Sequence, residues 1–241
     1  MIKLENTDVY GWEAAIRGMR NPMNSWDQSD SGLTIMNPTD VEVGYEPNYE
    51  YIIGENDIKL MKNLSKAGND HGKFLRMINV TVDITAPLYW WKEFDTYKVG
   101  TVANSCSTMH KIHAKEFDFD DFSHDHMIST MGESFESVDW LEMTIDLLNK
   151  YRERYLETKV KPMKEESKRA SLMKQYWWQM IQILPASYNQ KRTAQLNYQV
   201  LKSMYFARRN HKLDEWHDFC AWCENLPYFK EICIQERDPN G

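Results

Sequence analysis

Residues 74–84 alternate between apolar and polar side chains and run directly into a stretch with helical spacing. The apolar positions of the alternation are Ile78, Val80, Val82 and Ile84. The alternation is regular from Ile78 to Ile84 and predicts a strand with one buried face. From Leu88 to Phe94 apolar residues recur at helical spacing, and Pro87 stands where the first turn of a helix tolerates a proline. The sequence therefore predicts a strand that leads into a helix, with the next segment at the end of this strand–helix unit.

Small polar side chains surround a single thiol, Cys106, in that next segment. They are Thr101, Asn104, Ser105, Ser107 and Thr108, and Gly100 precedes them. We expect a loop here, with many hydroxyl and amide donors and no large side chain to fill space. Such a loop suits closing around a polar ligand. A solvated surface connection is the alternative that these residues leave open.

Length, charge and cysteine content limit the class of protein. The 241 residues are enough to bury a core, and a formal net charge of −7 argues against direct binding of nucleic acid. No stretch approaches the roughly 18 apolar residues of a membrane span, so we expect no transmembrane helix. The N-terminus lacks the pattern of a signal peptide, so we expect the four cysteines to be reduced thiols of a cytoplasmic protein.

The rest of the chain is mainly helical in pattern. We expect a short edge strand at residues 1–6 and a long loop, with at most short strands, at residues 21–50. A helix capped by Asp8 is predicted to end at Asn21-Pro22. The other predicted helices cover residues 56–66, 138–184 with a break near Lys161-Pro162, 193–210 and 213–226.

Two groups of residues raise the question of a metal site. The first is a set of carboxylates and imidazoles in the irregular segment 112–137, namely Asp118, Asp120, Asp121, His124, Asp125 and His126. Their spacing matches no recognised metal-binding loop, so we expect a solvated acidic turn. The second is Cys220-x-x-Cys223, which has no second pair nearby and is therefore expected to be two buried structural thiols. No metal site is predicted.

Arg208 lies on an apolar stripe of the predicted helix 193–210. Asn197, Leu201, Met204 and Arg208 follow one another at spacings of four, three and four. An asparagine and an arginine on such a stripe either reach into a site or extend to solvent at its ends. Both readings stay open at this point.

In their order, these pieces resemble the flavin-dependent thymidylate synthases over roughly residues 8–225. The anchors are the Glu-Ala-Ala-Ile-Arg helix, the helix after Gly54, the stretch Ala86–Phe94, Leu184-Pro185, Asn197 and Arg208. Without gaps, the family's Arg-His-Arg triplet falls on Thr96, Tyr97 and Lys98, and the rest of its signature falls on Thr101 through Met109. Asn104 replaces the family's glutamate, Cys106 its serine and Thr108 its second arginine. Met77 and Ile181 replace a histidine and an arginine of the family.

The resemblance implies a single α+β domain over residues 1–241, with a mixed or antiparallel sheet covered by helices. It implies a homotetramer with sites between subunits, which methylates dUMP reductively at C5 to give dTMP or carries out a related modification of a pyrimidine nucleotide. FAD is the implied cofactor, with NADPH and methylenetetrahydrofolate as co-substrates. The implied flavin-binding residues are Thr96, Tyr97, Lys98, Asn104 and Ser203, and those that bind the pyrimidine nucleotide are Glu93, Cys106, Ser107, Thr108 and Arg208.

The resemblance makes Cys106 the candidate catalytic residue, because a thiolate is a stronger nucleophile than the hydroxyl that it replaces. A thiol without chemistry is the alternative. For the whole chain, the alternatives are a non-catalytic pyrimidine-nucleotide-binding oligomer that has lost the flavin-binding triplet, and a purely structural oligomer.

Overall fold

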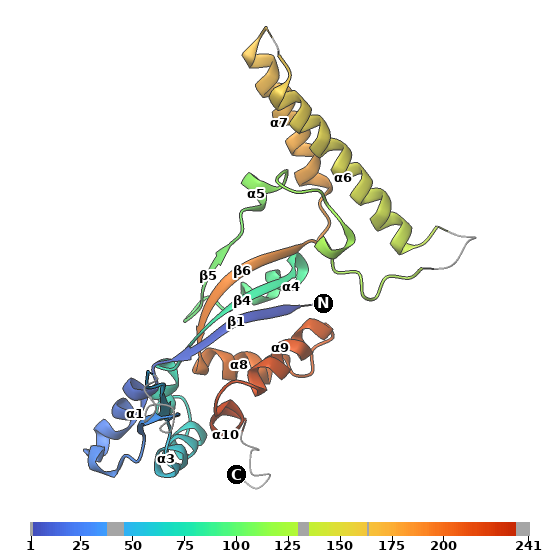
Figure 1. Cartoon of the computed structure of the whole chain (residues 1–241). Coiled ribbons are helices and arrows are strands. Elements are labelled where there is room, and N and C mark those ends of the chain that lie inside the picture. Colours follow the sequence, from blue (N-terminus) through green and yellow to red (C-terminus); the bar gives the residue numbers. More distant parts are fainter. Residues whose placement is uncertain (1, 38–45, 130–134, 163, 235–241) are drawn as a thin grey trace. The chain divides into compact units, whose positions relative to one another are not determined.

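A computed structural model describes residues 2–37, 46–129, 135–162 and 164–234 (Figure 1). The chain divides into two compact units. Unit 1 comprises Met1–Lys3, Asp83–Thr96 and Ala103–Thr193, and unit 2 comprises Leu4–Val82, Tyr97–Val102 and Ala194–Gly241.

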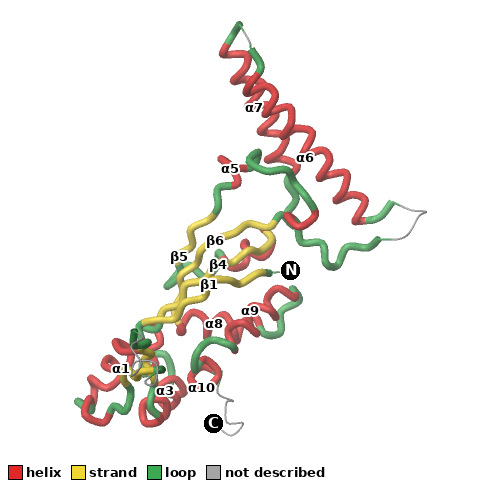
Figure 2. The backbone as a smooth tube through the Cα atoms, in the orientation of Figure 1, coloured by secondary structure: helices red, strands yellow, loops and turns green. Residues whose placement is uncertain are grey.

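The main sheet has four strands in the order β1-β4-β6-β5. Their bounds are β1 Lys3–Tyr10, β4 Asn79–Pro87, β5 Val102–Ser105 and β6 Asn189–Asn197. Figure 2 shows the strands in yellow. A second, two-stranded sheet pairs β2 (Gly32–Ile35) antiparallel with β3 (Tyr49–Ile52). Together with the helices, this antiparallel architecture confirms the predicted α+β fold class.

Strand β4 has the predicted alternation, with every second side chain buried. Its bounds differ from the prediction, because residues Gly72–Arg76 form a 3-10 helix, η3, before it and the strand continues to Pro87. Helix α4 (Leu88–Phe94) then follows without a loop, with Pro87 as its N-cap. Trp90, Trp91 and Phe94 bury their rings on this helix, with ring centroids 5.0–5.2 Å apart.

In unit 1, helices α6 (Ser137–Val160) and α7 (Glu166–Ile183) pack against each other along their length (Figure 1). Because α6 ends at Val160 and Pro162 follows, the predicted break is confirmed. At the base of the pair, a buried cluster joins the helices to the preceding segment. It consists of Ile112, Phe117, Phe122, Leu141, Ile145, Leu148 and Met180. The same segment contains the short helices α5 (Thr108–Lys111) and η4 (Phe119–Asp121).

The helices of unit 2 are α1 (Trp12–Arg20), α3 (Glu55–Lys66), α8 (Tyr198–Arg208), α9 (Asp214–Glu224) and α10 (Phe229–Cys233). Tyr198 lies at the centre of their packing. Its ring contacts the rings of Trp12 and Phe229 at centroid distances of 5.4 and 5.3 Å, and its hydroxyl donates to the carbonyl of Pro227 at 2.6 Å.

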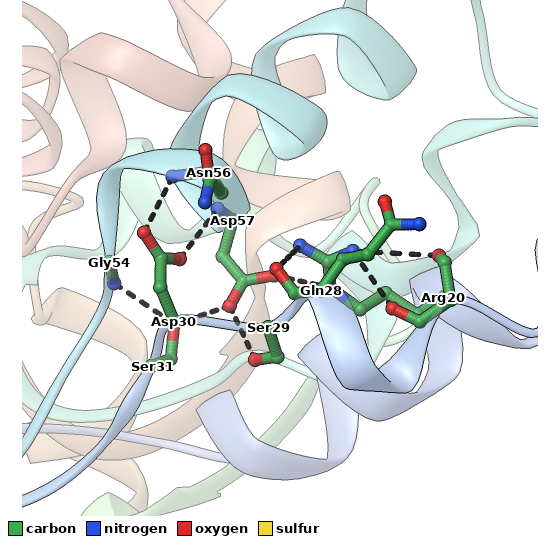
Figure 3. A network of polar contacts seen from close by, with 9 residues as sticks. Arg20, Gln28, Ser29, Asp30, Ser31, Gly54, Asn56 and Asp57 are labelled. Carbon is green, nitrogen blue, oxygen red and sulfur yellow. Dashed lines mark hydrogen bonds and ion pairs between the residues drawn. The ribbon is translucent and has the colours of Figure 1, made fainter.

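A buried ion pair between Arg20 and Asp57 holds the irregular segment after α1 against α3 (Figure 3). Arg20 Nε donates to Asp57 Oδ1 at 2.7 Å, and the other carboxylate oxygen accepts from the hydroxyls of Ser29 and Ser31, each at 2.6 Å. Arg20 also donates to the carbonyls of Ser25 and Gln28, both at 3.0 Å. Both side chains are almost fully buried, at 4% and 0% exposure. The segment 21–37 begins with the 3-10 helices η1 (Asn21–Met23) and η2 (Trp26–Gln28). The buried ion pair and the hydrogen bonds of its two side chains therefore hold this segment in place.

Several predicted boundaries are wrong. Asp8 lies within β1 and caps nothing, because the strand runs to Tyr10. Helix α1 has Gly11 as its N-cap, at φ +97°, where a Cβ would come within 2.1 Å of the Met77 carbonyl oxygen. The helix predicted at 193–210 begins only at Tyr198, since residues 189–197 form β6.

Two further predictions concern the long loop at residues 21–50 and membrane-spanning helices. The long loop predicted at 21–50 contains η1, η2, β2 and the start of β3, and its residues 38–45 lie outside the described part of the chain, as do residues 130–134 of the acidic segment. None of the described helices combines the length and apolar character needed to cross a membrane.

Candidate functional site

The segment predicted as a polar loop is instead a short strand followed by one helical turn. In β5, all four side chains from Val102 to Ser105 are exposed, so Asn104 projects from a strand without a buried face. Cys106 is exposed as well, and its backbone N–H donates to the Lys191 carbonyl at 2.9 Å. Ser107 caps α5, where its hydroxyl accepts from the His110 N–H at 3.2 Å. The same oxygen lies 2.7 Å from His110 Nδ1, so the hydroxyl that was predicted to bind the nucleotide is already engaged by two groups of His110.

The side chain of Gln190 joins two of the predicted site residues in unit 1. Its Nε2 donates to the Cys106 carbonyl and to the Thr108 hydroxyl, both at 3.1 Å. Thr108 is half-buried. Cys106 and Thr108 are therefore held by one amide from the neighbouring strand β6.

Glu93 and Thr96 lie together where α4 ends. The Thr96 hydroxyl donates to the Glu93 carbonyl at 2.7 Å, and the Thr96 N–H donates to the same oxygen at 3.1 Å. These bonds satisfy a carbonyl of the last helical turn. The hydroxyl of Thr96 thus has a local structural partner in addition to its predicted role at the flavin.

In unit 2, Arg208 lies half-buried against two aromatic rings. Its Nε donates to the Tyr97 hydroxyl at 2.9 Å, and its guanidinium lies 4.8 Å from the centroid of the Trp216 ring and 5.5 Å from that of the Tyr97 ring. Cation–π and hydrogen-bond contacts of this kind hold a guanidinium plane in one orientation. The arginine is therefore oriented before any ligand arrives, and Tyr97 contributes to that orientation.

The other predicted residues of unit 2 differ in whether their polar groups are exposed or form hydrogen bonds within the protein. Lys98 is exposed, whereas the Ser203 hydroxyl donates to the Gln199 carbonyl of its own helix at 3.0 Å. Asn197 is not part of the predicted apolar stripe: it is the N-cap of α8, and its Oδ1 accepts from the Val200 N–H at 3.0 Å. Gly100, at φ +77°, passes so close to this cap that a Cβ would lie 3.0 Å from Asn197 Nδ2.

The remaining cysteines are buried. Cys220 and Cys223 lie on α9 and Cys233 on α10. Burial raises the pKa of the Cys220 thiol to about 11 and that of Cys233 to about 12, and it raises the pKa of Cys223 well above its usual value. Thiols of this kind are unreactive at neutral pH.

The charged side chains in the acidic segment of unit 1 interact with groups that are close in sequence. Asp118 and Asp121 form the capping box of η4, and Lys115 forms an ion pair with Asp121 at 2.6 Å. Across the described ranges, no three His, Cys, Asp or Glu side chains gather as a metal site.

The sequence analysis did not identify two residues of β6 that the structure places beside this site, Gln190 and Arg192. Gln190 Oε1 accepts from Arg192 Nε at 3.0 Å, and Arg192 Nη1 donates to Asp95 Oδ1 at 2.7 Å. Alternation of Ala194 and Leu196, both buried, with polar neighbours is the signal that could have revealed the strand.

The backbone as a whole matches solved structures. No known protein-family model matches the sequence, and no curated protein matches it. A structure of thymidylate synthase X (ThyX) from Helicobacter pylori with FAD and dUMP has a TM-score of 0.61 at 14% identity, over 98% of each chain. Another structure of the flavin-dependent thymidylate synthase ThyX from Helicobacter pylori, complexed with FAD and dUMP, has a TM-score of 0.62 at 15% identity, over 97% of this chain and 98% of that one. The chain has the fold of a flavin-dependent thymidylate synthase. At this identity the likeness concerns the thymidylate synthase fold alone, and the residues of the site have to be judged on their own chemistry.

Proposed function

We propose that the protein is a flavin-dependent thymidylate synthase-like enzyme that binds FAD and methylates dUMP, or a related pyrimidine nucleotide, at C5. The observation that carries the proposal is the match of fold over 98% of both chains to a protein whose structure contains FAD and dUMP. NADPH and methylenetetrahydrofolate are the proposed co-substrates. When bound, the flavin supplies the hydride of the reductive methylation.

The proposed nucleotide contacts follow from the chemistry of each group. Arg208 binds the phosphate, because its oriented guanidinium matches phosphate geometry. Glu93, Ser107 and Thr108 contact the nucleotide through hydrogen bonds. Cys106 positions the pyrimidine with its exposed thiol.

The residues present also fit a flavin. Lys98 is an exposed ammonium that suits a phosphate, and Asn104 is an exposed amide that suits the polar edge of the ring. Thr96, Tyr97 and Ser203 complete the proposed set. The Tyr97 hydroxyl already accepts from Arg208, so this residue supports the phosphate contact as well as the flavin.

A non-catalytic nucleotide-binding protein is the second candidate. Arg208 is present and well oriented, whereas Thr96, Tyr97 and Lys98 supply one cation where the family's triplet supplies up to three. Loss of two cations weakens the hold on a negatively charged cofactor more than the hold on the nucleotide.

We propose that the protein is a homotetramer in the cytoplasm, with its sites between subunits. Trp140, Met143 and Leu147 follow one another on α6 at spacings of three and four and remain exposed, which supports an interface along this helix.

Adding flavin to the purified protein tests the proposal. The protein is expected to turn yellow and to show a saturable rise in Tm with FAD, because a ligand of the native state stabilises it. Absorption and thermal unfolding measure the two effects. Colourless protein with no shift in Tm, but with dUMP binding retained, would favour the non-catalytic candidate.

Cys106→Ser tests how the thiol acts. If Cys106 positions the pyrimidine, the serine variant keeps most of the parent's rate of dTMP formation, since serine is close in volume and is the residue that the family uses. If the thiol forms a covalent bond, the rate falls by several orders of magnitude. We expect the serine variant to keep most of the rate. An unchanged rate in Cys106→Ala would show that the thiol takes no part in the reaction.

A further inference from the structure

We propose that Arg192 is a positioning residue: it fixes the amide of Gln190, which in turn holds the segment Cys106–Thr108 in the conformation that receives the nucleotide. The second half of this inference rests on the proposed function, whereas the first half concerns the protein alone. None of the anchors of the family resemblance includes either residue.

The orientation of the Gln190 amide follows from its three partners. The oxygen Oε1 faces Arg192 Nε at 3.0 Å, and a guanidinium has only donors. Nε2 therefore faces the other way, toward the Cys106 carbonyl and the Thr108 hydroxyl, each 3.1 Å away. With Arg192 in place the amide has one favourable orientation, and that orientation supplies the two donors that the segment needs.

Arg192 is itself held from two sides. Nη1 donates to Asp95 Oδ1 at 2.7 Å, and the guanidinium lies over the Trp91 ring at 4.1 Å from its centroid. The Trp91 indole N–H donates to the Gln190 carbonyl at 2.9 Å, so the ring that carries the arginine is also tied to β6. The arginine side chain is only 15% exposed. Helix α4, strand β6 and the Cys106 segment are thus joined through one guanidinium.

The chemistry of this position calls for arginine. One planar group must donate to a carboxylate and an amide oxygen in different directions while it stacks on an indole. A lysine is a point charge and cannot meet all three requirements with fixed geometry. The position of the arginine is also notable because Thr108, which it reaches through Gln190, stands where the family's signature has its second arginine.

The neighbouring residue Lys191 provides a matched control. It lies on the same strand and forms an ion pair with Asp83 at 3.1 Å. Lys191→Met therefore removes one cation and its ion pair with Asp83 from β6, and it leaves the side chains of Arg192 and Gln190 in place. The backbone carbonyl of Lys191, which accepts from Cys106, is unchanged by the substitution.

Reaction of Cys106 with an aromatic disulfide reagent tests the relay without any ligand. The structure describes all four cysteines, and Cys106 is the exposed one among them. The fast phase of the reaction with the reagent therefore comes from Cys106, and its rate reports how accessible this segment is. Arg192→Met and Gln190→Glu are each expected to raise the rate of this phase by about fivefold to tenfold, because two hydrogen bonds that restrain the segment weaken or disappear. The double variant should react no faster than the faster single variant, since both changes break one network. Lys191→Met should leave the rate within about twofold of the parent.

Binding of dUMP tests the functional half. We expect Arg192→Met and Gln190→Glu to weaken dUMP binding by about tenfold, and Lys191→Met to leave it unchanged. Unchanged thiol rates in both relay variants would overturn the inference, and altered thiol rates with unaltered dUMP affinity would overturn its functional half. If the parent itself binds no dUMP, the proposed function fails, while the thiol rates still decide whether Arg192 positions the segment. Gln190→Glu keeps the test valid if Arg192→Met does not fold.

Discussion

Replacing Asp57 with alanine is expected to lower the free energy of unfolding by about 3–5 kcal/mol, because it leaves the buried guanidinium of Arg20 without its carboxylate. The two side chains are 4% and 0% exposed, so water cannot replace the lost partner. The hydroxyls of Ser29 and Ser31 lose their acceptor in the same step. Urea unfolding followed by fluorescence of the many tryptophans measures the change.

Glu13→Ala is the matched control for this prediction. Glu13 forms an ion pair with Arg17 on the same helix, at 3.3 Å, but there the two side chains are 74% and 63% exposed. We expect a loss of about 0.5 kcal/mol or less, because solvent screens an exposed pair. A loss for Asp57→Ala as small as that for Glu13→Ala would contradict a stabilising role of the buried network.

The same ion pair makes part of the stability dependent on pH. Burial alone would raise the pKa of Asp57, but hydrogen bonds from Ser29, Ser31 and Arg20 outweigh it and lower the pKa below its ordinary value of about 4. A carboxyl with a depressed pKa in the folded state stabilises the protein above its unfolded pKa and loses that contribution as the pH falls through the folded pKa. The difference in stability between the parent and Asp57→Ala should therefore shrink below about pH 4.

Arg208→Ala is expected to weaken dUMP binding by roughly 1.5–3 kcal/mol, or about tenfold to a hundredfold, the usual contribution of a charge-assisted hydrogen bond. The guanidinium is already oriented by Tyr97 and Trp216, so little conformational entropy is lost when the phosphate binds. Isothermal titration with dUMP measures the effect.

Arg209→Ala serves as the control for this variant, because Arg209 is the next residue, is exposed, and also contacts a ring, that of Phe206 at 5.2 Å. We expect its dUMP affinity to equal that of the parent. If Arg208→Ala keeps full affinity but melts at a lower temperature, then Arg208 is a structural cation of α8 and the proposed phosphate contact is wrong.

The elements that the sequence predicted well are those that bury a periodic face. In β4, the side chains of Val80, Val82 and Ile84 alternate with polar neighbours and are buried as expected. The break between α6 and α7 was predictable because Pro162 cannot continue a helix. By contrast, β5 was predicted as a loop because Val102–Ser105 bury nothing, and a strand held only by its backbone pairing leaves no pattern in the side chains.

The candidate site, whose residues stay predictions, could be proposed from the sequence only where single residues stand at positions of a known signature. Cys106, Thr108 and Arg208 were proposed in this way, from their positions along the chain. Gln190 and Arg192 were not, since the partners that give them a role, Thr108 and Asp95, lie 82 and 97 residues away in sequence. Only the pairing of β6 in the sheet brings such residues together, and that pairing was hidden because a helix was predicted over its second half.

The exposure of the whole segment from Val102 to Ser107 has a consequence for how such a protein can change. Substitutions at exposed positions usually alter the free energy of unfolding by about 0.5 kcal/mol or less. The residues of this segment to which the proposed function assigns a ligand are therefore almost uncoupled from those that set whether the chain folds. Mutation can exchange the side chains at Asn104 and Cys106, where the signature has a glutamate and a serine, with little penalty in folding. Single substitutions can thus adapt this segment to a different nucleotide, or to none, while the fold of the chain stays the same.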